Sequence, residues 1–264
     1  MVEFENMSFS YNDNIIFKEL NCHIKDGSKV VLLLNNGSGK TTLFNLLNGT
    51  LRNNKSVIMD NLLVTPDTAH DIRLDTVFIP TIISDYFIFD NVYDELKLRL
   101  LQRGDSLGSI NRKINETLEL LNLETCLEKD PKELSVNDQY LLVLANILIT
   151  EPKYIVIDDS LSLCPTKPKE LIIKHLKKSS ATIIYLTSKL DDVLNFKRCI
   201  VIHESKVVLD GTPDAVCNET KILRICGFSL TFTMELSHKL ILYNMINKIT
   251  NSYRKLVLSL GIKH

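Results

Sequence analysis

Apolar residues in the first part of the chain form short runs separated by turn residues such as Asn12-Asp13-Asn14 and Asp26-Gly27. The continuous apolar run Val30–Leu34 is typical of a strand that is buried on both faces of a parallel sheet. The pattern therefore predicts strands at Val2–Phe9, Ile15–Ile24, Val30–Leu34, Lys55–Met59, Leu62–Thr65 and Asp75–Ile79.

After residue 80 the spacing of apolar residues changes to three and four, which predicts helices at Asn91–Arg103, Ile110–Leu121 and Val136–Ile149. Strands and helices then alternate again, with strands at Tyr154–Asp158, Thr182–Thr187, Arg198–His203 and Lys206–Leu209 and a helix within Pro168–Lys177. This order predicts an α/β fold whose parallel core carries a helical insert at about residues 80–150. We expect a main domain over residues 1–218 and a small helical extension over residues 219–264.

Composition narrows the classes of partner. The chain of 264 residues has 31 Lys and Arg against 32 Asp and Glu, so it offers no basic field for a nucleic-acid backbone. None of its apolar stretches approaches the ~20 residues of a membrane span, so any membrane role would need a partner. The 6 cysteines form no C-x-x-C pair, which favours free thiols in a reducing compartment.

The residues Asn36, Gly37, Ser38, Gly39, Lys40, Thr41 and Thr42 follow the buried strand and open a helix, as a Walker A phosphate loop does. Its glycines let backbone N–H groups turn toward an anion, Lys40 would reach the β- and γ-phosphates of ATP, and the Thr41 hydroxyl would hold Mg²⁺. Leu34 stands where the full motif has glycine, so we expect a restricted backbone there. A plain turn is the alternative reading, but the flanking strand and helix argue against it.

Further motifs follow in the order and at the spacing found in ABC ATPases over residues 1–217. They are Phe9-Ser10-Tyr11, Leu134-Ser135-Val136-Asn137-Asp138, Ile155-Val156-Ile157-Asp158-Asp159, Ile184-Tyr185-Leu186-Thr187-Ser188 and Asp210-Gly211-Thr212-Pro213. The chain therefore resembles the ATP-binding subunits of ABC transporters, which have a P-loop NTPase core. The resemblance implies that Tyr11 stacks on adenine, that Asp158 joins Thr41 in holding Mg²⁺, and that Ser135 points toward the γ-phosphate of a partner subunit's ATP.

The segment that begins Gly227-Phe228-Ser229-Leu230 resembles the C-terminal extension of energy-coupling factor (ECF) transporter ATPases. That resemblance implies two partners, a second ABC ATPase subunit in a heterodimer and a transmembrane transporter subunit. It also implies a peripheral place on the cytoplasmic face of the cell membrane, with membrane contact only through the partner, and import of a small solute such as a vitamin or metal ion. An ordinary ABC importer subunit with a different tail is the alternative.

Several positions depart from the ABC pattern in ways that weaken ATP hydrolysis. Asp159 stands where ABC ATPases have the catalytic Glu, and Ser188 stands where they have the switch His. Ile79, directly after Val77-Phe78, stands where they have Gln. The segment Leu134–Asp138 resembles the ABC signature, L-S-G-G-Q, and Val136 and Asn137 replace its two glycines. Displacing a catalytic carboxylate by about 1 Å costs on the order of 10²-fold in rate. Asp159 and Ser188 remain the candidate catalytic residues, with hydrolysis expected to be weak.

Other interpretations stay open from the sequence alone. The chain could be a nucleotide-binding regulatory subunit without enzymatic activity, or a soluble ABC protein that acts on DNA or ribosomes. The segment Ser135–Asp138 could simply cap the following helix. The helix Asn91–Arg103 could be a solvated face, or it could dock the membrane partner together with Tyr86, Phe87 and Phe89, which are unusually apolar for a surface loop.

Overall fold

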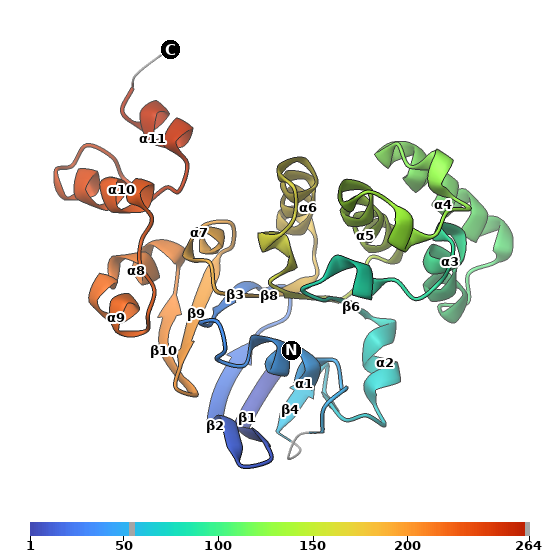
Figure 1. Ribbon diagram of the computed structural model, residues 1–264, viewed down its shortest axis with the longest axis horizontal. Helices are drawn as coiled ribbons and strands as arrows, with labels where there is room; N and C mark the ends of the chain where they lie inside the picture. Colours follow the sequence, from blue (N-terminus) through green and yellow to red (C-terminus); the bar gives the residue numbers. More distant parts are fainter. Residues whose placement is uncertain (53–55, 262–264) are drawn as a thin grey trace.

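The computed structural model of the protein describes residues 1–52 and 56–261. Its larger sheet has the strand order β10-β9-β3-β8-β7-β6 (Figure 1). These strands are β3 (Lys29–Leu33), β6 (Thr76–Ile79), β7 (Tyr154–Asp158), β8 (Thr182–Thr187), β9 (Arg198–His203) and β10 (Lys206–Gly211). β9, β3, β8, β7 and β6 run parallel, while β10 is antiparallel to β9. The carboxyl ends of the parallel strands therefore share one edge, which is where ligands bind in such sheets.

A smaller antiparallel sheet has the order β2-β1-β4-β5 and lies below the larger one in Figure 1. Its strands are β1 (Val2–Tyr11), β2 (Asn14–Ile24), β4 (Val57–Met59) and β5 (Leu62–Leu63). Alternate residues of β3 contribute to two separate hydrophobic clusters, with Val31 and Leu33 in one and Val30 and Leu32 in the other. The expectation that this strand is buried on both faces is confirmed.

The helical insert lies between β6 and β7, at one end of the larger sheet (Figure 1). It contains α3 (Val92–Gln102), α4 (Leu107–Leu121) and α5 (Val136–Thr150), with 3-10 turns η1 (Ile83–Tyr86), η2 (Glu124–Cys126) and η3 (Pro131–Glu133). The side chains of Asn91, Ser106 and Ser135 each accept a hydrogen bond from a backbone N–H of the first turn of the helix they precede. The predicted α/β fold with a helical insert is confirmed.

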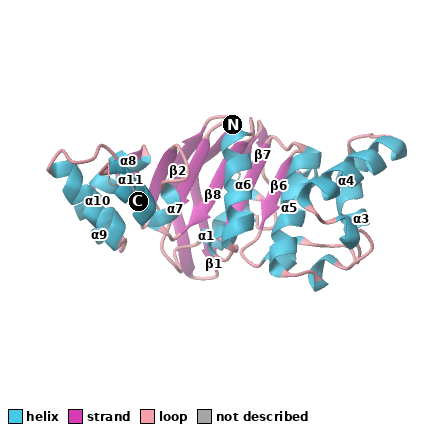
Figure 2. Ribbon diagram, turned by 90° about the horizontal axis from the view of Figure 1, so that it is seen from above, coloured by secondary structure: helices cyan, strands magenta, loops and turns pink. Residues whose placement is uncertain are grey.

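The remaining helices cover the sheets and form the C-terminal segment. They are α1 (Lys40–Leu47), α2 (Ala69–Leu74), α6 (Thr166–Lys178), α7 (Leu190–Val193), α8 (Pro213–Asn218), α9 (Thr220–Ile225), α10 (Phe232–Leu242) and α11 (Tyr253–Ser259), with the 3-10 turn η4 (Ser160–Ser162). Figure 2 shows α6 lying across the larger sheet, with α8 to α11 at the end opposite the insert. Within the described residues, no helix is long and apolar enough to cross a bilayer.

Among the predicted elements whose bounds differ in the structure, three lie between Lys40 and Thr65. The helix that the residues from Asn36 to Thr42 were expected to open begins at Lys40. The strand expected over Lys55–Met59 begins at Val57, and Lys55 lies outside the described residues. The strand expected over Leu62–Thr65 ends at Leu63. Its last residues form a turn instead, because the Thr68 hydroxyl donates to the Leu63 carbonyl at 2.6 Å and accepts from the Thr65 N–H at 3.0 Å.

Candidate functional site

The predicted phosphate loop connects the carboxyl end of β3 to the first turn of α1. Gly37 and Gly39 have φ angles of +76° and +92°, and they are the only residues between Leu34 and Thr42 with positive φ. A Cβ on Gly39 would lie 2.5 Å from Ile16 Cγ2 and 2.8 Å from the Phe17 ring, so β2 leaves room only for glycine at this position. The backbone can therefore turn its N–H groups toward an anion at the start of α1.

Leu34 does not restrict the loop in the way expected from the sequence. Its N–H donates to the Thr187 carbonyl at 3.0 Å, which extends the β3–β8 pairing by one residue. Its side chain is fully buried in the cluster between the two sheets. Because the left-handed angles fall on Gly37 and Gly39, the chain turns without glycine at position 34.

Lys40 is the first residue of α1, and its ammonium group lies at the centre of the loop. Nζ donates to Asn36 Oδ1 at 2.9 Å and to the Asn35 carbonyl at 3.3 Å, and it lies 3.9 Å from Asp159 Oδ2. Burial lowers the pKa of Lys40, while the nearby carboxylates of Asp159 and Asp158 oppose that shift. A bound phosphate would favour the charged ammonium form in the same way.

Asp158 ends β7, two strands from β3 in the sheet, and its side chain is almost fully buried. Burial has the largest effect on the pKa of Asp158 and raises it, while hydrogen bonds from the Thr41 and Thr81 hydroxyls act in the opposite direction. Its Oδ1 atom has no hydrogen-bond partner among the described residues. A buried carboxylate oxygen with a free lone pair beside a hydroxyl is a suitable donor set for Mg²⁺, which takes few protein ligands together with nucleotide phosphates.

Asp159 is held by hydroxyl groups from neighbouring elements. Oδ1 accepts from Ser162 Oγ at 2.5 Å and Thr187 Oγ1 at 2.9 Å, and Oδ2 accepts from Ser188 Oγ at 3.4 Å. Its backbone has a φ of +52°, and its N–H donates to the Leu186 carbonyl at 2.8 Å. The structure thus brings Asp159, Ser188 and Lys40 together. Ser162 and Thr187 were not predicted as contacts of Asp159, because the 3-10 turn η4 and the end of β8 bring their hydroxyl groups to it only in the folded chain.

A family model described as ABC transporter matches residues 17–162. The chain belongs to the ABC transporter family. The energy-coupling factor transporter ATP-binding protein EcfA1 of Leuconostoc mesenteroides is 26% identical over 247 residues, covering 90% of each chain. EcfA1 of Halalkalibacterium halodurans is 28% identical, covering 88% of this chain and 86% of the relative.

The fold of this ABC protein also matches a solved structure. The match is to cbiO1 from Clostridium perfringens, described as part of the ABC transporter complex cbiONQ. The two structures superpose with a TM-score of 0.69 at 23% identity, covering 84% of this chain and 92% of that one. At this identity the likeness concerns the fold alone.

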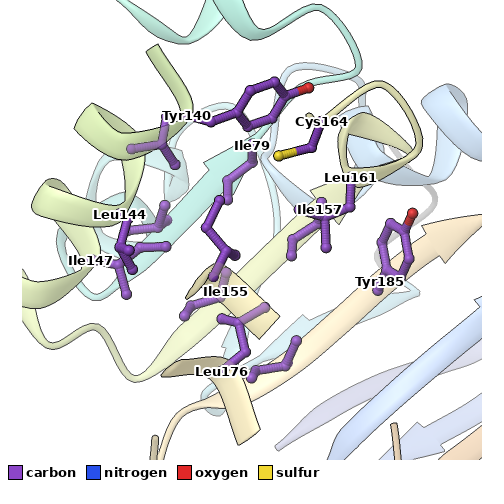
Figure 3. Close-up of a cluster of buried hydrophobic side chains, with 14 of the residues drawn as sticks. Ile79, Tyr140, Leu144, Ile147, Ile155, Ile157, Leu161, Cys164, Leu176 and Tyr185 are labelled. Atoms are coloured by element: carbon purple, nitrogen blue, oxygen red, sulfur yellow. The ribbon is translucent and has the colours of Figure 1, made fainter. Parts of the chain in front are cut away.

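Ile79, at the position where ABC ATPases have Gln, points into the hydrophobic core. It is 2% exposed and belongs to the larger buried cluster. Figure 3 shows it among Tyr140, Leu144 and Ile157. The polar side chain that reaches Asp158 from this segment is Thr81, which follows the strand and was not predicted as a site residue.

Ser135 forms the N-cap of α5, as the alternative reading of the signature segment proposed. Its Oγ accepts from the Asp138 N–H at 3.2 Å and donates to Asp138 Oδ2 at 2.7 Å. The neighbouring Val136 side chain is 53% exposed. In this monomer the hydroxyl is therefore engaged within its own helix, and a surface-exposed valine stands where the family has glycine.

Tyr11 lies at the end of β1, where it pairs with Asn14 across the hairpin. Its ring is 45% exposed and packs edge-on against Phe9, with 4.9 Å between the ring centroids. With this exposure the ring can stack on a planar ligand. The β1–β2 hairpin also packs on the phosphate loop, through Ile16 and Phe17 against Gly39.

The segment before α3 is less apolar at its surface than expected. Tyr86 and Phe87 are buried against the insert, whereas Ile82 and Ile88 are exposed. The difference arises because Glu95 of α3 accepts the backbone N–H groups of Ile88 and Phe89 at 2.8 and 3.0 Å, which fixes the turn. Phe89, the third aromatic residue expected at this surface, is half-buried. The exposed isoleucines, with part of Phe89, therefore form the apolar part of this surface in place of Tyr86 and Phe87.

Proposed function

We propose that this chain is the ATP-binding subunit of an ECF-type ABC transporter. The observation that carries the proposal is the phosphate loop at the carboxyl end of β3, beside the buried Asp158 whose Oδ1 lacks a partner among the described residues. The names of the relatives, ECF transporter ATP-binding proteins, support the transporter class. In this reading the subunit lies on the cytoplasmic face of the membrane.

The proposed ATP site uses residues from the hairpin, the phosphate loop and β7. Tyr11 stacks on adenine, and the backbone around Asn36, Gly37, Ser38 and Gly39 receives the phosphates together with Lys40 and Thr42. Thr41 and Asp158 hold Mg²⁺, which neutralises phosphate charge when it is bound. Thr42 is buried in α1, so its contribution is through the backbone N–H at the helix start.

Hydrolysis at this site is expected to be weak. Asp159 already accepts three hydroxyl hydrogen bonds, which leaves few lone pairs to orient an attacking water. Ser188 supplies a hydroxyl where the family has imidazole, and it is turned toward Asp159. Losing one donor that stabilises transition-state charge costs on the order of 10²–10³-fold in kcat.

The proposed partners are a second ABC ATPase subunit and a transmembrane transporter subunit. In an ABC dimer the ATP of one subunit faces the signature of the other. Because Val136 and Asn137 carry side chains where glycines would approach the nucleotide, a heterodimer with an ATPase that keeps its signature is favoured over a homodimer. The transported solute would be small, such as a vitamin or a metal ion. The division into residues 1–218 and 219–264 stays a prediction.

Titration calorimetry tests nucleotide binding directly. Lys40→Ala removes the ammonium group that faces the β- and γ-phosphates and is expected to abolish measurable ATP binding. Lys206→Ala, at an exposed position of β10, is the matched control and should bind ATP as the wild type does. Unchanged ATP affinity in Lys40→Ala would rule out this loop as the nucleotide site.

A non-hydrolysing nucleotide-binding subunit is the second candidate. The hydroxyl groups around Asp159 favour it, since they hold the carboxylate in place without substrate. In this alternative, bound ATP keeps the dimer closed and the partner subunit hydrolyses its own ATP. Transport by a complex in which this chain carries Asp159→Ala would support the second candidate, and complete loss of transport would support the first.

A further inference from the structure

The turn after α9 lies directly against the phosphate loop. Asn35 Nδ2 donates a hydrogen bond to the carbonyl of Cys226. The backbone carbonyl of the same Asn35 accepts from Ser38 Oγ at 2.6 Å, from the Ser38 N–H at 3.2 Å and from Lys40 Nζ at 3.3 Å. Asn35 therefore joins the interior of the phosphate loop to the C-terminal segment.

The fit between this turn and Asn35 is close. Gly227 has a φ of +80°, and a Cβ at this position would lie 2.8 Å from Asn35 Nδ2. The turn is also fixed on the side away from Asn35. The Phe228 N–H donates to the Leu223 carbonyl at 2.8 Å, and the side chains of Phe228 and Leu223 are buried in the main core cluster. A side chain at position 227 would thus push on Asn35 rather than move the turn away.

A second contact connects the C-terminal segment to the other side of the site. Asp191 of α7 follows the candidate catalytic Ser188 closely in sequence. Its Oδ1 accepts from Thr231 Oγ1 at 3.1 Å, and its backbone carbonyl accepts from Asn251 Nδ2 at 2.7 Å. The C-terminal segment therefore contacts both the phosphate loop and the segment that follows β8.

We propose that Asn35 and Gly227 are positioning residues through which the Cys226–Gly227 turn holds the phosphate loop in its nucleotide-binding shape. The inference rests on the proposed binding of ATP at this loop. Binding of ATP and docking of the turn are then coupled, and the coupling is reciprocal: ATP stabilises the docked turn as much as the docked turn favours ATP. Through this contact, the docking of the C-terminal segment depends on whether ATP is bound at the phosphate loop.

The first test compares two glycine variants in the full chain by ATP titration calorimetry. Gly227→Ala introduces the Cβ that meets Asn35, and it is expected to raise the Kd for ATP about tenfold, within the range of such couplings. Gly104→Ala is the matched control, because Gly104 has a φ of +82° and nothing lies within 4 Å of its added Cβ. The control places alanine at a similar positive φ without the contact to Asn35, and it should bind ATP as the wild type does.

The second test uses hydrogen exchange and does not depend on Gly227→Ala folding. In the wild type, ATP is expected to slow amide exchange over residues 219–230 as well as in the phosphate loop. Asn35→Ala keeps the backbone carbonyl but removes the donor to Cys226, so ATP should still slow exchange in the loop while its effect on residues 219–230 is lost.

Each outcome decides the inference. If Gly227→Ala binds ATP with wild-type affinity, or if ATP still slows exchange over residues 219–230 in Asn35→Ala, the inference is overturned while the proposed function stands. If the wild-type chain binds no ATP, the proposed function and this inference fall together.

Discussion

Replacing Ile79 by the Gln that ABC ATPases carry at this position is expected to destabilise the protein without adding a polar group to the site. Ile79 is 2% exposed among Tyr140, Leu144 and Ile157 (Figure 3). Losing the burial of an isoleucine side chain costs about 1.5–3 kcal/mol, and burying an amide without partners costs about 1–3 kcal/mol more. Ile79→Gln should therefore lower the free energy of unfolding by about 2.5–6 kcal/mol, a large part of the stability of an ordinary domain.

Urea unfolding followed by circular dichroism measures this loss. Ile82→Gln is the matched control, because the Ile82 side chain is 58% exposed and its replacement should change stability by less than about 0.5 kcal/mol. If Ile79→Gln proved as stable as Ile82→Gln, the side chain at position 79 would point out of the core and toward the phosphates, contrary to this expectation.

Two further perturbations follow from the site and the insert. Glu95→Ala leaves the N–H groups of Ile88 and Phe89 without their acceptor and should lower the free energy of unfolding by about 1–3 kcal/mol. Glu116→Ala, at an exposed position of α4, is the control, and an equal free energy of unfolding for the two variants would contradict the contact. Asp159→Glu combined with Ser188→His should raise ATP turnover by more than the sum of the two single changes, because catalytic groups act as a unit. Turnover is assayed with an intact partner ATPase. Full turnover from Asp159→Glu alone would show that Ser188 is an adequate substitute for His.

The loop from Asn36 to Thr42 and the strand that ends at Asp158 could be predicted from sequence because each is a local pattern. The apolar run ending at Leu34, the glycines and Lys40 occupy consecutive positions, and Asp158 ends its own apolar strand. The alternation of strands and helices also predicted the α/β fold and the place of the insert. Bounds were less accurate where side chains bond to nearby backbone, as at Thr65 and Thr68.

Contacts between distant segments were not readable from sequence. The Asn35 contact with Cys226 and the hydroxyl groups around Asp159 depend on how strand ends and loops meet in the fold. The burial of Tyr86 and Phe87 depends on Glu95, whose carboxylate holds the turn from a neighbouring helix. The sequence alone therefore did not show whether an apolar residue of this loop lies in the core or at the surface.

We propose that this subunit binds ATP at its phosphate loop and hydrolyses it poorly. The most direct measurement is a phosphate-release assay on the purified chain, at an ATP concentration where calorimetry shows the site to be saturated. The expected result is stoichiometric binding of ATP with turnover on the order of 10⁻² s⁻¹ or less, about 10²-fold below the low end of typical enzymes. Saturated binding with a kcat of about 1 s⁻¹ or more would contradict it.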